Sequence, residues 1–119
     1  MKYTVGIDLG STTTKAVVLN EQGALLGRGI TNSRSNYDVA CQVALGEALI
    51  NTRFALIAGE LEQAGVDAGE RQRAVGELER VFRAEQYRMQ LRVLASELHR
   101  FLSRLLTRHP TLAPAVTLI

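Results

Sequence analysis

Two hydrophobic periodicities divide the chain into short strands followed by long helices. Alternating and β-branched residues predict strands at residues 3–9 and 15–19, separated by a small-residue turn at residues 10–14. A second turn, residues 20–23, ends on a glycine and suits a type I turn followed by a left-handed residue. Residues 24–31 then return as a third strand, which its two glycines weaken. A small β-sheet is therefore expected at the start of the chain.

Apolar residues recur at helical spacing through residues 36–67. One set comprises Val39, Val43, Ile50, Phe54, Ile57 and Leu61. Several leucines lie on another side, so this helix is expected to be buried on more than one face. Ser35 or Asn36 is a candidate N-cap, and Gly65 is a candidate C-cap. A second, very long helix is predicted from residue 69 to about residue 107, and the two helices are expected to form an antiparallel pair.

The end of the chain is expected to leave the helix. Proline disfavours helical geometry in the residue before it, so His109-Pro110 should end the second helix. Four of residues 115–119 are apolar, and the segment predicts the start of a further strand. Four segments follow from these patterns: a β-sheet portion (1–35), a first helix (36–67), a long helical segment (68–110) and a strand start (111–119). The apolar end looks truncated, as in a fragment of a longer protein.

The composition favours a folded domain: 119 residues are 46% apolar. The single cysteine, Cys41, cannot form a disulfide or a multi-thiolate metal site within the chain and is expected to fill the core. His99 and His109 have no partner at metal-ligand spacing and are expected to be structural or exposed. No signal-peptide core or bilayer-spanning apolar run is present, so no membrane association and a cytoplasmic location are expected.

Charge is distributed unevenly along the chain. Residues 1–35 contain 4 basic residues (Lys and Arg) and 2 acidic residues (Asp and Glu). Residues 36–67 contain 1 basic and 5 acidic residues, and residues 68–119 contain 9 basic and 5 acidic residues. The two later segments therefore carry net charges of −4 and +4. Opposite charges on neighbouring segments favour packing between them, or simple solvation, over binding of nucleic acid or an acidic protein. No nucleic-acid partner is expected.

The candidate chemistry lies in residues 8–15, Asp-Leu-Gly-Ser-Thr-Thr-Thr-Lys, a tight turn between two strands. Gly10 has no Cβ, so the backbone N–H groups after it can approach a polyphosphate closely. Lys15 supplies a positive charge for the β- and γ-phosphate oxygens, and Asp8 can hold a hydrated Mg²⁺ ion. Neutral donors are added by Ser11, Thr12 and Thr13. The stretch predicts a loop that binds ATP and Mg²⁺, with Asp8 and Lys15 as candidate catalytic residues.

This loop differs from the best-known nucleotide-binding motifs. A Walker A loop needs GxxxxGK[ST] leading into a helix, whereas here the chain returns as a strand. A turn of Gly, Ser and Thr can also serve only to close a hairpin. Asp8 and Lys15 at the two strand ends favour the phosphate-binding interpretation, because they fill roles that phosphoryl transfer requires.

The segment GIDLGSTTTK, residues 6–15, resembles the first phosphate motif of the actin, Hsp70 and sugar-kinase superfamily. Roughly residues 3–54 resemble the ATP-hydrolysing subunits of benzoyl-CoA reductase and the related activators of 2-hydroxyacyl-CoA dehydratases. The resemblance implies an α/β fold, the N-terminal part of an actin-like, ribonuclease H-like ATPase domain. It also implies that Asp8 is the magnesium-side carboxylate and that Lys15 lies on the β- and γ-phosphates.

The resemblance further implies an ATPase that carries an iron-sulfur cluster between two related subunits. ATP hydrolysis would drive low-potential electrons onto catalytic reductase subunits that reduce an aromatic acyl-CoA. The family's second phosphate loop, adenosine-binding segment and cluster cysteines have no counterpart here, so the cluster ligands are expected outside this chain. Three alternatives stay open: an activator of a 2-hydroxyacyl-CoA dehydratase, a small-molecule kinase of the superfamily, and a non-enzymatic helical interaction module.

Overall fold

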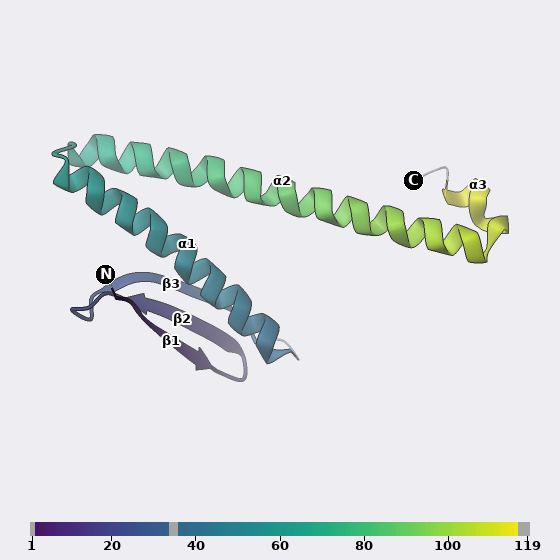
Figure 1. Cartoon of the computed structure of the whole chain (residues 1–119), viewed down its shortest axis with the longest axis horizontal. Helices are drawn as coiled ribbons and strands as arrows, with labels where there is room; N and C mark the ends of the chain where they lie inside the picture. Colours follow the sequence, from purple (N-terminus) through teal and green to yellow (C-terminus); the bar gives the residue numbers. More distant parts are fainter. Residues whose placement is uncertain (1, 34–35, 117–119) are drawn as a thin grey trace. The chain divides into compact units, whose positions relative to one another are not determined.

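A computed structural model describes residues 2–33 and 36–116. Three strands, β1 (Thr4–Leu9), β2 (Thr13–Leu19) and β3 (Leu25–Asn32), are followed by two long helices, α1 (Tyr37–Gln63) and α2 (Ala68–Arg108) (Figure 1). A 3-10 turn (η1, Pro110–Leu112) and a short helix (α3, Ala113–Val116) complete the described chain. The α/β prediction is confirmed. The chain divides into two units, Met1–Glu77 and Leu78–Ile119, and each is described by itself.

The sheet of the first unit is an antiparallel meander in the order β1-β2-β3. The turn between β2 and β3 is the predicted one, since the N–H of Gly23 donates to the carbonyl of Asn20 at 3.0 Å and Gly23 has φ +77°. The Asn20 side chain also accepts hydrogen bonds from the N–H groups of Gln22 and Ala24, at 3.0 and 2.8 Å. This local network holds the turn and thereby sets the register of β3.

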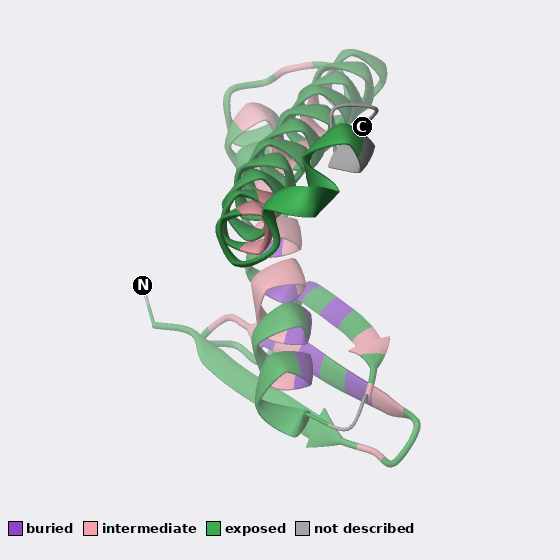
Figure 2. Cartoon of the chain, turned by 90° about the vertical axis from the view of Figure 1, so that its right-hand side faces the viewer, coloured by how far each residue is buried: buried purple, intermediate pink, exposed green. Residues whose placement is uncertain are grey.

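Helix α1 packs on the sheet through small residues. Its buried residues, Ala40, Ala44, Ala48 and Thr52, recur once per turn along one face. Ala44, Ala48 and Thr52 lie against Gly27 and Gly29 of β3, where a Cβ atom would overlap helix atoms. Helix and strand therefore approach backbone to backbone (Figure 2).

The larger apolar residues of α1 do not form this contact. Val39 and Val43, which the apolar periodicity placed on the buried stripe, are 51% and 50% exposed. The prediction that α1 is buried on more than one face is wrong for the described residues, because only the alanine face is buried. The buried cluster consists of Ala16, Val18, Ala44 and Ala48, with Leu45 packed against it.

Local signals set the ends of the helices. Asn36 is the N-cap of α1 and accepts a hydrogen bond from the N–H of Val39 at 3.2 Å, whereas Ser35 lies outside the described residues. After the C-cap residue comes Gly65, whose φ of +79° allows its N–H and the next one to donate to carbonyls of the last turn at 3.0 Å. Asp67 then starts α2 by accepting from two N–H groups of its first turn, at 2.8 and 3.3 Å.

The chain after α2 differs from the prediction of a strand start in residues 111–119. Ala115 and Val116 belong to α3, while residues 117–119 lie outside the described residues. A lone strand leaves its backbone N–H and C=O groups without partners, whereas a short helix satisfies them locally. The predicted antiparallel pairing of α1 with α2 stays a prediction. In the described ranges, no helix has the length and apolar character needed to cross a membrane.

Candidate phosphate-binding site

The structure brings Asp8 and Lys15 together as direct partners in the β1–β2 ladder. Side chains alternate along a strand, and the neighbours of Lys15, Thr14 and Ala16, are buried towards α1. Asp8 and Lys15 therefore share the opposite, exposed face of the sheet. No ion pair joins the two side chains among the contacts of the described residues, so both are available to a ligand.

The loop beside this pair is closed by a hydrogen bond from the N–H of Gly10 to the carbonyl of Thr13, at 3.0 Å. A Cβ atom on Gly10 would lie 2.7 Å from that oxygen, so the closure requires glycine. Ser11 and Thr12 are exposed at the tip, and within the described part of the chain their N–H groups make no hydrogen bond. The loop thus presents two open amides and two hydroxyls next to Lys15.

Strand β2 begins at Thr13, two residues earlier than predicted. Thr13 lies on the same sheet face as Lys15, because the two residues are separated by one position along β2. Thr14, by contrast, is fully buried, and its Oγ1 lies 2.7 Å from Oγ of Ser33. The N–H of Ser33 also donates to the carbonyl of Thr12 at 2.8 Å. The hydrogen bonds of Thr14 and Ser33 therefore support the loop on its buried side. Helix α1 begins at the same end of the sheet as this loop (Figure 1).

Sequence reasoning missed Arg28 as a neighbour of the candidate site. In the β2–β3 register Arg28 pairs with Val17, which places it on the same face as Lys15 and one step along the sheet. Lys15 and Arg28 also border an open groove of about 650 Å³ that Glu47 and Asn51 of α1 line as well; Asp8 and the loop at residues 10–14 do not line this groove. Strand alternation combined with the turn at residues 20–23 would have located this second cation.

The described residues offer limited metal chemistry. Within residues 2–33 and 36–116, no group of three or more His, Cys, Asp or Glu side chains could hold a metal ion. Mg²⁺ bound to a nucleotide needs only one or two carboxylates besides phosphate oxygens and waters, so Asp8 fits that ion. Cys41 is half-buried and lies outside the buried cluster, so it is not the core residue predicted. An iron-sulfur cluster requires several thiolates, and the residues described here do not fit it. His99 and His109 are both exposed.

Comparison with known proteins extends the resemblance beyond the first helix. Residues 5–100 match the model of the BadF/BadG/BcrA/BcrD ATPase family, a range that includes the hairpin with Asp8 and Lys15, α1 and most of α2. Neither a curated protein nor a solved structure matches the chain. Because the family match covers well over half of the sequence, the chain belongs to the BadF/BadG/BcrA/BcrD ATPase family.

Proposed function

We propose that the β1–β2 hairpin binds the phosphates of Mg-ATP and that the protein hydrolyses this nucleotide. The observation that carries the proposal is the pairing of Asp8 with Lys15 on one exposed sheet face, beside a loop with open N–H groups. An ATPase family provides the wider context. The domain to which the hairpin contributes is proposed to be actin-like, with a ribonuclease H-like topology.

Each group has a distinct task in this proposal. Lys15 places a positive charge on the β- and γ-phosphate oxygens, where negative charge must be stabilised during phosphoryl transfer. The N–H groups of Ser11 and Thr12 and the hydroxyls of the loop donate to further phosphate oxygens. Asp8 accepts hydrogen bonds from water in the Mg²⁺ shell. Arg28 adds a second positive charge on the same face.

We further propose that ATP hydrolysis serves low-potential electron transfer to a benzoyl-CoA reductase, together with a homologous ATPase subunit. The support is the resemblance of roughly residues 3–54 and the family match. The iron-sulfur cluster of such a system would take its ligands from elsewhere, since Cys41 is the sequence's one cysteine. An activator of a 2-hydroxyacyl-CoA dehydratase and a small-molecule kinase share the same loop, so they are the competing functions.

Substitution of Lys15 tests the nucleotide site. A hydrogen bond to a charged group contributes about 1.5–3 kcal/mol, so Lys15→Ala should weaken Mg-ATP binding about tenfold or more. Calorimetric titration of Mg-ATP measures the change. The matched control is Lys2→Ala, which removes the other lysine of the sequence, also exposed, from outside the loop. Equal affinities for the Lys15 variant and the unaltered protein would overturn the assignment.

Asp8→Asn tests the proposed magnesium role separately from nucleotide binding. The amide keeps the size of the side chain but loses its charge, so ATP hydrolysis should fall and require more Mg²⁺. Phosphate release is measured across a magnesium titration. Normal hydrolysis at every magnesium concentration would show that Asp8 has a different role.

The products distinguish an ATPase from a kinase. The proposed activity releases inorganic phosphate in equal amount to ADP without any added acceptor. A kinase would instead form ADP only when a hydroxyl-bearing substrate receives the γ-phosphate. Dependence of ADP formation on such an acceptor would therefore favour the kinase alternative.

A further inference from the structure

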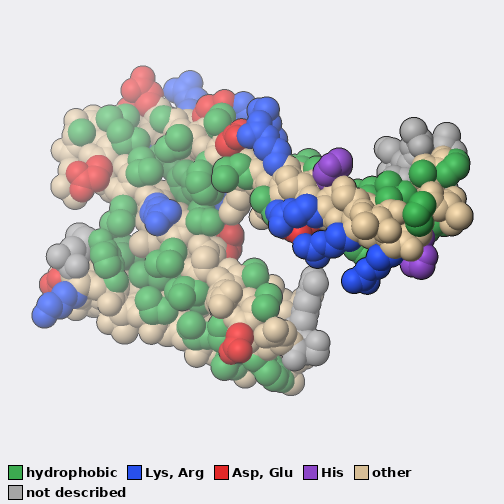
Figure 3. All heavy atoms as spheres, turned by 45° about the vertical axis from the view of Figure 1, so that its right-hand side comes forward, with side chains coloured by type: hydrophobic (Ala, Val, Ile, Leu, Met, Phe, Trp, Pro, Cys, Tyr) green, Lys and Arg blue, Asp and Glu red, His purple; other side chains and the backbone are tan. Residues whose placement is uncertain are grey.

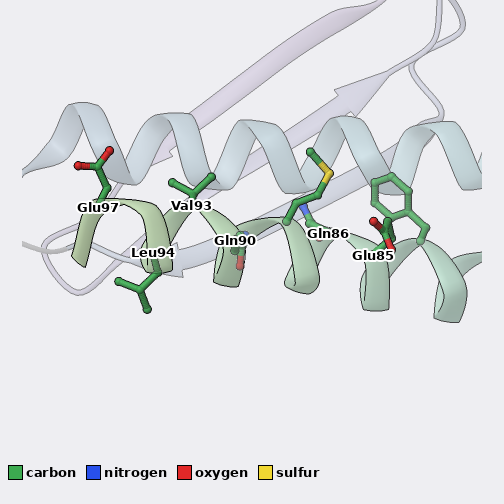
Figure 4. Close-up of a pocket in the computed structure, with 8 residues that line it drawn as sticks. Glu85, Gln86, Gln90, Val93, Leu94 and Glu97 are labelled. Carbon is green, nitrogen blue, oxygen red and sulfur yellow. The ribbon is translucent and has the colours of Figure 1, made fainter. Parts of the chain in front are cut away.

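Helix α2 carries two apolar faces instead of one. The first face consists of Val75, Leu78, Phe82, Met89 and Val93. The second face, which we name the distal face, consists of Leu91, Leu94, Leu98, Phe101 and Leu105. With 3.6 residues per turn, the centres of the two faces lie about 140° apart around the helix. Figure 4 shows the change of side directly, because the neighbouring side chains of Val93 and Leu94 point to different sides of α2.

One straight neighbour cannot cover both faces. Because the centres of the two faces lie about 140° apart, a single straight helix packed on the first face leaves the distal face uncovered.

The distal face is apolar and open in the described structure. Leu94 and Phe101 are 63% and 61% exposed, and α2 contains no buried residue among those described. The 3-4-3-4 spacing of its five residues is the pattern by which one amphipathic helix packs against another. A continuous apolar face of this kind marks an interaction site.

The charges around the distal face indicate what kind of partner fits. Residues 86–108 contain five arginines and one acidic residue, Glu97, which gives a net charge of +4. Glu97 is already paired with Arg100 at 2.8 Å. Arg104 and Arg108 have no ion pair within the described chain, and their helical positions place them about 100° and 60° from the centre of the distal face, along one of its borders. Figure 3 shows Lys and Arg side chains gathered beside hydrophobic ones on this part of α2.

These arginines favour protein carboxylates as their ligands. The segment has no lysine, and the planar guanidinium of Arg matches a carboxylate with two parallel hydrogen bonds. Arginine is enriched and lysine depleted in the cores of protein interfaces. A second copy of this chain is a poorer occupant, because pairing two distal faces would bring two segments of net charge +4 together.

We propose that the distal face of α2 binds an acidic amphipathic helix of a partner protein. The partner helix would lay an apolar stripe on Leu94, Leu98 and Phe101, while its Glu or Asp side chains pair with Arg104 and Arg108. This surface shares no residue with the proposed nucleotide site, so the proposal does not depend on the proposed function.

A pair of synthetic peptides tests the chemistry of the partner. The probe is a 21-residue helix with leucines at 3-4 spacing and glutamates on both borders, and its control carries lysines in place of the glutamates. We expect fluorescence anisotropy to show binding of the acidic peptide at least tenfold tighter than that of the basic peptide. Raising the salt concentration should weaken the binding. Equal affinity for the two peptides, or no binding, would overturn the proposal.

Matched variants locate the binding surface. Leu98→Gln with Phe101→Gln should abolish binding of the acidic peptide, and Arg104→Gln with Arg108→Gln should weaken it at least tenfold. Ser96→Gln, which lies away from the distal face on the same half of α2, should leave binding unchanged. Equal binding by all variants would contradict the proposed location.

Two further measurements decide between the other occupants. Light scattering after size exclusion should give the same oligomeric state for the protein and the Leu98→Gln/Phe101→Gln variant. A dimer lost in this variant would identify a second copy as the occupant instead. The unaltered protein should co-sediment with vesicles of phosphatidylserine and phosphatidylcholine no more strongly than the Leu98→Gln/Phe101→Gln variant does. Vesicle binding that requires Leu98 and Phe101 would identify a membrane surface and overturn the proposal.

Discussion

The first unit buries small side chains, whereas the distal half of α2 exposes large ones. Ala44, Ala48 and Gly29 are buried where α1 meets β3. Leu98 and Phe101 are 47% and 61% exposed on α2. The comparison shows that side chains are buried where the backbones of two elements approach each other closely. The hydrophobicity of a residue alone does not predict whether it is buried.

The cause is the number of surfaces that each region supplies. A sheet and a helix in the first unit give two apolar layers that can cover each other. The distal half of α2 is a single amphipathic helix, which cannot bury its own stripe. The first region is therefore stabilised from within, whereas the second leaves its apolar stripe exposed in the described structure.

The largest expected effect is at the contact between glycine and helix. In Gly29→Ala the added Cβ would overlap the carbonyl oxygen of Ala44, so α1 must move away from β3. Overpacking of this kind should lower the free energy of unfolding by about 3 kcal/mol. Urea unfolding, with hydrogen exchange of the β2 and β3 amides, measures the loss.

Gly59→Ala is the matched control, because nothing lies within 4 Å of a Cβ at that helical position. Alanine should raise stability there by up to about 1 kcal/mol, through helix propensity alone. If both substitutions change stability equally, the close approach of α1 to β3 is not what stabilises the first unit.

A smaller loss is expected behind the phosphate loop. Thr14→Val keeps the shape of the buried side chain but removes its hydrogen bond with Ser33, at a cost of about 1 kcal/mol. Thermal unfolding measures the loss. Thr4→Val, on the exposed strand β1, is the control and should stay within about 0.5 kcal/mol. An unchanged melting temperature for the Thr14 variant would show that the hydrogen bond between Thr14 and Ser33 does not stabilise the fold.

The smallest effect is expected on the distal face of α2. Leu98→Gln removes a large apolar side chain, yet this residue is 47% exposed and glutamine is a good helix former. The free energy of unfolding should change by less than about 0.5 kcal/mol. A loss of 2 kcal/mol or more in the same urea experiment would show that Leu98 is buried within the protein itself.

Local sequence signals determined the elements and the composition of the candidate site. Asn36 and Gly65 mark the ends of α1 because caps act within one helical turn. Asn20 and Gly23 specify the turn that sets the register of β3. The candidate phosphate-binding loop was recognisable because Asp8 and Lys15 flank a glycine that admits no side chain.

Only the tertiary structure decided which faces meet. The periodicity of α1 favoured its large apolar residues as the buried stripe, yet the alanines are buried instead. That choice depends on Gly27 and Gly29, which lie on another element and leave room only for small side chains. Arg28 likewise joined the face of Lys15 only through the pairing of β2 with β3. Contacts between elements distant in sequence depend on which surfaces approach each other, and periodicity within one element does not contain that information.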